Sequence, residues 1–261
     1  MPGEILTSPK NPHIQLARSL LEQSKARRKH NSFAAEGARV LEDGLASAAP
    51  LQFILYKSSL TPRAKSVLGQ TKPEQLAFEV EDHLFESLSD TEASQGILGV
   101  FSVPEIHQPA KPGFVLILDQ LRDPGNLGTI LRSAEAAGVQ AVCLPPGTTD
   151  VWAPKVVRSG MGAHFRLPLL QWPWEAISAY VEELAVFHAD MQGQESLWQA
   201  DFRGRTALLI GGEAEGISPE GQQLATHSVR IPMTGKTESL NAAVSASVLM
   251  FEVLRQRSQK V

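Results

Sequence analysis

The 261-residue sequence contains a single cysteine, Cys143, and no long apolar run. One cysteine excludes an intramolecular disulfide and a zinc site built from several cysteines. It lies in the apolar run 141–144, where we expect it to act as a small buried hydrophobe. The N-terminus has no apolar segment of signal-peptide length, and no stretch is long and apolar enough to span a bilayer. These absences predict a soluble, cytoplasmic protein without a membrane partner.

The chain also lacks a positive net charge. Its net charge is −4 at pH 7, which argues against a general polyanion binder. Residues 1–30 are an exception, with six basic and two acidic residues. A local basic patch of this kind can hold an RNA backbone, although a solvated helix end has the same composition. The candidate RNA-binding residues of this patch are Lys25, Arg27, Arg28 and Lys29.

The length and composition are those of a globular protein with two domains. Hydrophobic residues make up 43% and charged residues 20% of the chain, which is an ordinary balance. Segment 102–113 contains three prolines and no hydrophobic period, as is typical of a linker. We therefore predict an RNA substrate-binding domain at 1–103, a linker at 104–113 and a second domain at 114–261.

The first domain is predicted to be a small α/β unit. Apolar residues recur at helical spacing from residue 12 to residue 27. Short strands are predicted at 32–35, 51–56, 77–80 and 97–101. Further helices are predicted at 37–46, 62–68 and 82–88.

After the linker, apolar strands alternate with helices. Residues 114–118 form a continuous apolar run, which is typical of a strand buried on both faces. Further strands are predicted at 140–144, 165–170, 186–189, 206–210 and 229–231. Helices are predicted at 126–137, 154–161, 174–184, after Ser218 and at 239–257. This alternation predicts a parallel sheet with helices on both faces.

Such a sheet binds its ligand at the carboxyl ends of its strands, so the segments that follow the strands are the candidate site. The first strand is not followed by G-x-G-x-x-G, and the chain has no P-loop G-x-x-x-x-G-K-[ST]. These absences argue against an NAD-dependent enzyme and against a P-loop nucleotide hydrolase.

The segment 119–132 follows the first strand of the second domain. Asn126 stands where a helix N-cap is expected. Arg132 falls outside the buried stripe of this helix, so we expect it to be exposed. Spacing alone favours the alternative of a surface arginine paired with Glu135, three residues further on.

Two further segments follow later strands. In 211–217, glycines let the backbone approach a ligand closely and Glu213 can hold a polar group, although a plain glycine-rich turn also fits. Ser239 is a natural N-cap for the last helix. That helix has an unusually small surface, which predicts close packing against a ligand or simply against another helix. The small residues are Ala242, Ala243, Ser245, Ala246 and Ser247.

Together and in this order, the three segments resemble the motifs of the SpoU (TrmH-like) branch of the SPOUT RNA methyltransferases. The matching patterns are N-x-G-x-x-x-R from Asn126 to Arg132, G-x-E-x-x-G from Gly211 to Gly216, and I-P-M…S-L-N from Ile231 to Asn241. The segments 6–12 and 33–37 resemble that family's ribosomal-protein-like substrate-binding domain. One departure is Gly160, where serine is expected, and it touches no predicted catalytic position.

The resemblance implies a trefoil-knotted methyltransferase domain, a homodimer, S-adenosylmethionine as cofactor and an RNA ribose 2′-hydroxyl as acceptor, with no metal site. By position, the reaction centre corresponds to Asn126, Arg132, Glu213, Ser239 and Asn241. The cofactor-binding positions correspond to Leu144, Gly211, Gly212, Ile231, Met233 and Leu240. Because arginine stays protonated, we expect Arg132 to clamp a phosphate and stabilise the developing alkoxide rather than act as the base.

Two other interpretations stay open from the sequence. One is a catalytically inactive RNA-binding module on the same fold, against which the joint presence of all five reaction-centre residues argues. The other is an unrelated doubly wound enzyme such as a nucleotide hydrolase, against which the missing phosphate loop argues. Within the family, a separate N-terminal domain is commoner in ribosomal RNA enzymes. The resemblance therefore favours 23S-type ribosomal RNA over transfer RNA as the substrate.

Overall fold

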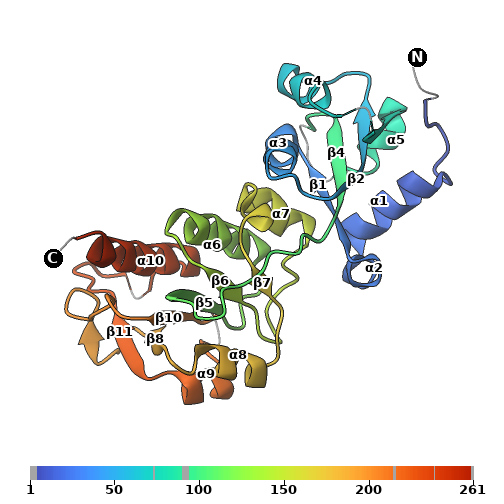
Figure 1. Cartoon of the computed structure of the whole chain (residues 1–261). Coiled ribbons are helices and arrows are strands. Elements are labelled where there is room, and N and C mark those ends of the chain that lie inside the picture. The colour runs from blue at the N-terminus through green and yellow to red at the C-terminus, as the bar shows by residue number, and fades with distance from the viewer. Residues whose placement is uncertain (1–4, 73, 90–93, 214–215, 238, 260–261) are drawn as a thin grey trace. The chain divides into compact units, whose positions relative to one another are not determined.

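The computed structural model describes residues 5–72, 74–89, 94–213, 216–237 and 239–259, and these form two compact units (Figure 1). Unit 1 comprises Met1–Glu105 and Trp152–Phe165. Unit 2 comprises Ile106–Val151 and Arg166–Val261. The first boundary falls in the predicted linker. The segment Trp152–Phe165 differs from the prediction, because it packs in unit 1 although the sequence predicted it to belong to the second domain.

Unit 1 is built on a four-stranded sheet in the order β1-β4-β2-β3. Strand β4 is antiparallel to β1 and β2, whereas β3 is parallel to β2. The strands are β1 (Ser32–Glu36), β2 (Leu51–Lys57), β3 (Leu76–Val80) and β4 (Ile97–Ser102). The helices are α1 (Pro12–Glu22), α2 (Ser24–His30), α3 (Ala38–Ala46), α4 (Pro62–Leu68), α5 (Asp82–Glu86) and α7 (Pro154–Gly160). The four predicted strands are confirmed to within one residue at each end.

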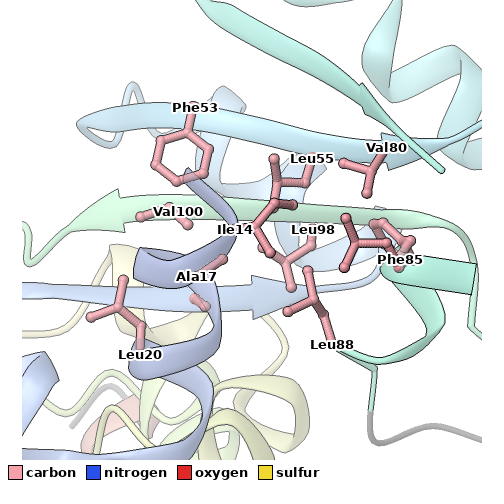
Figure 2. Packing of buried hydrophobic residues seen from close by; sticks show 12 residues of the cluster. Ile14, Ala17, Leu20, Phe53, Leu55, Val80, Phe85, Leu88, Leu98 and Val100 are labelled. Carbon is pink, nitrogen blue, oxygen red and sulfur yellow. The ribbon is translucent and has the colours of Figure 1, made fainter. Parts of the chain in front are cut away.

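The core of unit 1 lies where α1 and α5 pack against one face of this sheet (Figure 2). Leu55 and Leu98 project from neighbouring strands toward Ile14 of α1. The other members of this buried cluster are Ala17, Leu20, Ala34, Phe53, Val80, Leu84, Phe85, Leu88 and Val100.

The segment Trp152–Phe165 covers the other face of the sheet. Ala34 belongs to the first cluster, so its neighbour Phe33 points to the opposite side of β1. The Phe33 ring lies 4.7 Å from the Trp152 ring and 5.9 Å from the Phe165 ring, measured between centroids. Burial of these large rings explains why the segment packs with unit 1.

The predicted helix over residues 12–27 is two helices, because the backbone of Gln23 is extended (φ −123°, ψ 116°). Arg27, in α2, is only 7% exposed. Its Nη1 donates to the carbonyl oxygens of Leu20 at 2.6 Å and Leu21 at 3.4 Å. These carbonyls belong to the last turn of α1, which has no intrahelical donors left. Burial therefore removes Arg27 from the predicted basic patch, whose exposed members are Lys25, Arg28 and Lys29.

Unit 2 contains a seven-stranded sheet in the order β7-β6-β5-β10-β8-β11-β9. Every pairing in it is parallel, which confirms the predicted sheet. Helices α6 and α10 lie on one face, and α8 and α9 lie on the other (Figure 1). The strands are β5 (Phe114–Leu118), β6 (Ala141–Cys143), β7 (Leu169–Leu170), β8 (Ala185–Ala189), β9 (Glu195–Ser196), β10 (Thr206–Ile210) and β11 (His227–Arg230). The helices are α6 (Pro124–Ala136), α8 (Trp174–Val181), α9 (Pro219–Leu224) and α10 (Ala242–Ser258).

Three strands of unit 2 differ from the prediction by more than one residue, and one of them is β11, which starts at His227 instead of residue 229. The strand predicted at 165–170 is confined to β7 at Leu169–Leu170. Met161 and Gly162 have positive φ angles and lead into a 3-10 turn at Ala163–Phe165, so the chain is not extended there. The two-residue strand β9 was not predicted, since so short a segment shows no period. Cys143 is buried as expected, and burial raises the pKa of its thiol to about 12.

The role of Arg27 can be tested through stability. Arg27→Met removes the donor to two carbonyls at the end of α1, so we expect it to lower the free energy of unfolding by about 1–3 kcal/mol. The matched control is Arg28→Met, which changes an exposed neighbour and should be close to neutral. Urea unfolding of both variants measures the difference. Equal stability of the two would contradict the capping role.

Candidate active site

The carboxyl ends of β5, β8 and β10 meet at one edge of the unit 2 sheet. Leu118 of β5 pairs with Ile210 of β10, and Leu209 pairs with His188 of β8. The backbone N–H of Asp119 donates to the Ile210 carbonyl at 2.9 Å. The loops that leave β5 and β10 therefore start side by side, at the edge where a parallel sheet binds its ligand.

The loop after β10 needs glycine at two positions. A Cβ atom on Gly211 would lie 2.4 Å from the backbone carbon of Gly216, and one on Gly212 would lie 2.3 Å from the carbonyl oxygen of Gln120. Gly212 and Gly216 also exchange two backbone hydrogen bonds of 3.0 Å. Gly211 is therefore required by backbone packing within its own loop, and Gly212 by packing against the loop after β5, in addition to any approach of a ligand. The tip of the loop, 214–215, lies outside the described residues.

Three of the predicted catalytic side chains meet in one hydrogen-bonded cluster, which we call the amide–carboxylate cluster. It consists of Asn126, Glu213 and Asn241. The amide nitrogen of Asn126 donates to Oε1 of Glu213. Nδ2 of Asn241 donates to Oδ1 of Asn126 at 3.0 Å and to Oε1 of Glu213 at 3.3 Å. An ionised carboxylate only accepts hydrogen bonds, so Glu213 fixes both amides with their nitrogens toward it.

The helix caps beside this cluster differ from the prediction. The N-cap of α6 is Asp123, whose Oδ1 accepts from the N–H of Asn126 at 2.7 Å, so the predicted capping role of Asn126 is wrong. The N-cap of α10 is Asn241, whose Oδ1 accepts from the N–H of Ala243 at 2.9 Å. Ser239 is therefore not the cap. As a result, the side chain of Asn126 is available to Glu213, and Asn241 serves its helix and the cluster with different atoms.

Arg132 lies on the exposed surface of α6, six residues beyond Asn126. Glu135 pairs with Arg166 at 2.9 Å, so the surface pairing with Arg132 that the spacing allowed is not formed. Among the residues that the structure describes, Arg132 has no ion pair or hydrogen bond. No described residue therefore occupies its guanidinium, which can bind a group from outside the chain.

A cavity of about 870 Å³ lies beside the amide–carboxylate cluster. Six predicted site residues line it, namely Gly211, Gly212, Glu213, Ser239, Leu240 and Asn241. A smaller hollow of about 100 Å³ is lined by Ile231 and Met233, and it shares Ser239 and Leu240 with the larger cavity. Leu144 is not among the described lining residues of either cavity; it is buried, and its N–H donates to the carbonyl of Leu170 at 2.8 Å.

The sequence did not identify the contribution of β8. His188, Ala189, Asp190 and Met191 at the end of this strand line the larger cavity. The strand itself was predicted, so the rule that ligands bind at carboxyl ends would have indicated these residues. The cavity thus combines the carboxylates of Glu213 and Asp190, the imidazole of His188, backbone groups and apolar side chains. This lining and volume suit a nucleoside-sized molecule such as S-adenosylmethionine.

Asp119 was also missed. It is fully buried, and its Oδ2 accepts from the backbone N–H of Ser218 at 2.6 Å. Its Oδ1 has no partner among the described residues. Asp119 therefore ties the start of the loop after β5 to the end of the loop after β10. Only its position directly after a buried strand marked it in the sequence.

Membrane spans and metal sites are both absent from the described part of the chain. No helix there is long and apolar enough to cross a membrane. No group of three or more His, Cys, Asp or Glu side chains among the described residues is arranged to hold a metal ion.

The fold and site define the class of protein. The chain belongs to the SpoU rRNA methylase family, whose model matches residues 113–251. Residues 11–99 match the MRM3-like substrate binding domain. The predicted family membership is confirmed.

The sequence similarity to named relatives extends over both units. The 23S rRNA (guanosine(2553)-2′-O)-methyltransferase RlmP of Bacillus subtilis is 31% identical, over 89% of this chain and 92% of that protein. The mitochondrial rRNA methyltransferase 3 of Mus musculus is 31% identical, over 97% of this chain and 74% of that protein. The solved SpoU methyltransferase AviRb of Streptomyces viridochromogenes, in complex with AdoMet, is 28% identical and superimposes with a TM-score of 0.87, covering 97% of this chain and 100% of that one.

The glycine requirement in the site can be tested with one methyl group. Gly212→Ala places a Cβ against the carbonyl oxygen of Gln120, so we expect it to displace the loop. It should lower stability by about 1–3 kcal/mol and weaken the binding of S-adenosylmethionine. Gly204→Ala is the control, because a Cβ there meets no atom within 4 Å. Calorimetric titration measures the affinity of both variants for S-adenosylmethionine. Wild-type affinity in Gly212→Ala as well as in Gly204→Ala would contradict this account.

Proposed function

We propose that the protein transfers a methyl group from S-adenosylmethionine to a ribose 2′-hydroxyl of ribosomal RNA. The observation that carries the proposal is the amide–carboxylate cluster at the side of a nucleoside-sized cavity. The cluster lies in a chain of the SpoU rRNA methylase family. Relatives named as 23S rRNA 2′-O-methyltransferases from Bacillus subtilis and Streptomyces viridochromogenes support this substrate.

Each group of the site has a chemical role in this proposal. The bound cofactor supplies an electrophilic methyl group on a positively charged sulfur. The backbone of Gly211, Gly212 and Leu240 holds the cofactor, while Asn126, Glu213 and Asn241 orient the ribose. Transfer needs the 2′-oxygen in line with the methyl group, at roughly 3–3.5 Å before reaction. Ser239, exposed in the lining of the cavity, is available as a further hydrogen-bonding group.

Arg132 is proposed to bind the RNA phosphate next to the target ribose. Its guanidinium remains charged at neutral pH, so it cannot take the hydroxyl proton. A bidentate contact with phosphate would orient the nucleotide, and the positive charge would stabilise the alkoxide that forms as the 2′-hydroxyl passes its proton to solvent. As the bond from the 2′-oxygen to the methyl carbon forms, the bond from that carbon to sulfur would break, and the cofactor would leave as the neutral thioether. The exposed position of Arg132 on α6, where no described side chain pairs with it, supports this role.

The reaction itself is tested by incubating the purified protein and labelled S-adenosylmethionine with ribosomal RNA, and separately with transfer RNA. Label in ribosomal RNA, mapped to a 2′-O-methylated nucleotide, is the expected result. Label in transfer RNA alone would show that the substrate is transfer RNA and not ribosomal RNA. No label in either RNA, with cofactor binding intact, would favour an inactive RNA-binding module.

Removal of Arg132 tests its role in the transfer step. We expect Arg132→Ala to lower the single-turnover rate of methyl transfer by about a hundredfold or more, corresponding to roughly 2.7–4 kcal/mol for one transition-state donor. Affinity for the cofactor and thermal stability should not change. Arg166→Ala is the control, since it removes a surface arginine that pairs with Glu135. A wild-type single-turnover rate in Arg132→Ala would eliminate the assignment.

The exposed basic patch is proposed to add affinity for RNA. The match of residues 11–99 to a substrate-binding domain supports this. Replacing Lys25, Arg28 and Lys29 together with Gln should weaken RNA binding and reduce its log–log salt slope by roughly 0.7–0.9 for each phosphate that is no longer neutralised. Arg27 is left unchanged, because it caps α1. Filter binding at several salt concentrations gives the slope, and an unchanged slope would show that the patch is only a solvated helix end.

We further infer that the protein is a homodimer. Val244 and Phe251, two helical turns apart on α10, are 48% and 47% exposed. They form an apolar surface on one side of the helix, as interfaces between copies commonly do. Phe251→Asp should therefore give a monomer in analytical ultracentrifugation. A wild-type chain that sediments as a monomer at micromolar concentration would contradict the inference.

We propose that the last helix, α10, passes through a preceding loop to form a trefoil knot, as the family resemblance implies, and a crystal structure would test this. We also propose a cytoplasmic location, which cell fractionation would test.

A further inference from the structure

A second cavity lies wholly within unit 1, apart from the site in unit 2. Its volume is about 430 Å³. Its lining comes from the end of β1, from α3 and α4, from Gln95 and from α7. All these elements belong to unit 1, because the segment Trp152–Phe165 packs there. We call this cavity the arginine pocket.

Three guanidinium groups line the arginine pocket, from Arg39, Arg63 and Arg158. Nε of Arg39 pairs with Asp43 at 3.3 Å, and Nη2 of Arg63 pairs with Glu42; the two arginine side chains are 53% and 50% exposed. Each of these ion pairs uses one of the five donors of a guanidinium. Arg158 is half-buried, and its side chain has no ion pair or hydrogen bond among the described residues. The pocket therefore has many free donors.

One carboxylate, that of Glu36, also lines the pocket. Glu36 is 9% exposed and accepts hydrogen bonds from the hydroxyls of Ser89 at 2.5 Å and Ser94 at 2.8 Å. The lining therefore carries three positive charges and the Glu36 carboxylate, while Asp43 and Glu42 lie against Arg39 and Arg63. The guanidinium of Arg158, with which no described residue forms an ion pair, is the charge that is best placed to attract an anion.

The remaining lining groups suit a base as well as a phosphate. Val40 and Met161 are apolar, and Oε1 of Gln95 accepts from the N–H of Ala38 at 2.7 Å. This leaves the amide nitrogen of Gln95 as a donor. A guanidinium can stack on a base with its face and bind phosphate with its edge. The volume lies in the range of roughly 300–1,000 Å³ that accommodates small organic ligands, which is more than a single phosphate ion needs.

We propose that the arginine pocket of unit 1 binds one nucleotide of single-stranded RNA, in addition to the nucleotide bound at the reaction centre of unit 2. Arg158 and Arg39 would contact the phosphate, and the base would lie against Met161 and Val40. The proposal rests on the proposed function in taking RNA as the ligand. It is supported by the substrate-binding match over residues 11–99, which contain Arg39 and Arg63. The pocket would select the single-stranded segment of the RNA that unit 1 binds while the site in unit 2 methylates another nucleotide.

The test uses the full chain and a short single-stranded RNA carrying one 4-thiouridine. After irradiation, we expect cross-links in the tryptic peptide 159–166, which contains Met161. Arg158→Gln and Arg39→Gln should each weaken binding of this RNA by roughly tenfold, as expected for removal of one charged hydrogen-bonding partner. Lys155→Gln is the matched control, because Lys155 is exposed on the same helix and is not a lining residue. Thermal unfolding of all variants checks that they fold.

Three outcomes would overturn the proposal. The first is control-like RNA affinity in both arginine variants. The second is an absence of cross-links in the residues around the pocket. The third is competition by inorganic phosphate as effective as that by a nucleoside 5′-monophosphate, which would indicate an anion site only. None of these readouts requires methyl transfer. Intact cross-linking in a protein that fails to methylate RNA would reject the proposed function while supporting the pocket.

Discussion

Glu213 accepts hydrogen bonds from Asn126 and Asn241, two amides that lie 87 and 28 residues away in the chain. These hydrogen bonds depend on the register of the central strands. Because β5 and β10 are parallel and Leu118 pairs with Ile210, the loops that follow them start at the same level. A slip of one residue would turn the buried side chains of a strand to the other face and would separate Asn126 from Glu213.

Helix α10 connects the amide–carboxylate cluster to the C-terminal part of the chain. Its small residues Ala242, Ala243 and Ala246 are buried, which confirms the close packing predicted from the sequence. Asn241 begins the helix and joins the amide–carboxylate cluster. At the other end, Gln256 accepts from the N–H of Phe202 at 2.8 Å and donates to the carbonyl of Ala200, also at 2.8 Å. The helix is therefore fixed at both ends, so its first turn holds a constant position beside the cavity.

The sequence predicted the strands and the membership of the cluster more reliably than the local hydrogen bonds. Apolar runs such as 114–118 mark buried strands directly. Helix N-caps were harder to predict. Asp123 and Asn126 are both residue types that favour the N-cap position, and the local sequence does not distinguish between them. Arg27 was misassigned because a count of charges carries no information about which side chain turns inward. The packing of Trp152–Phe165 in unit 1 depends on ring packing against Phe33, which no local pattern reveals.

We propose that Asn126, Glu213 and Asn241 act as one unit that shapes the cofactor cavity. A double-mutant cycle of Asn126→Ala and Asn241→Ala, read by calorimetric binding of S-adenosylmethionine, tests it most directly. Residues in one hydrogen-bond network couple by about 0.5–3 kcal/mol, so the double variant should lose less affinity than the two single variants combined. Strictly additive losses of affinity would contradict the account, because they would mean that the two amides act independently.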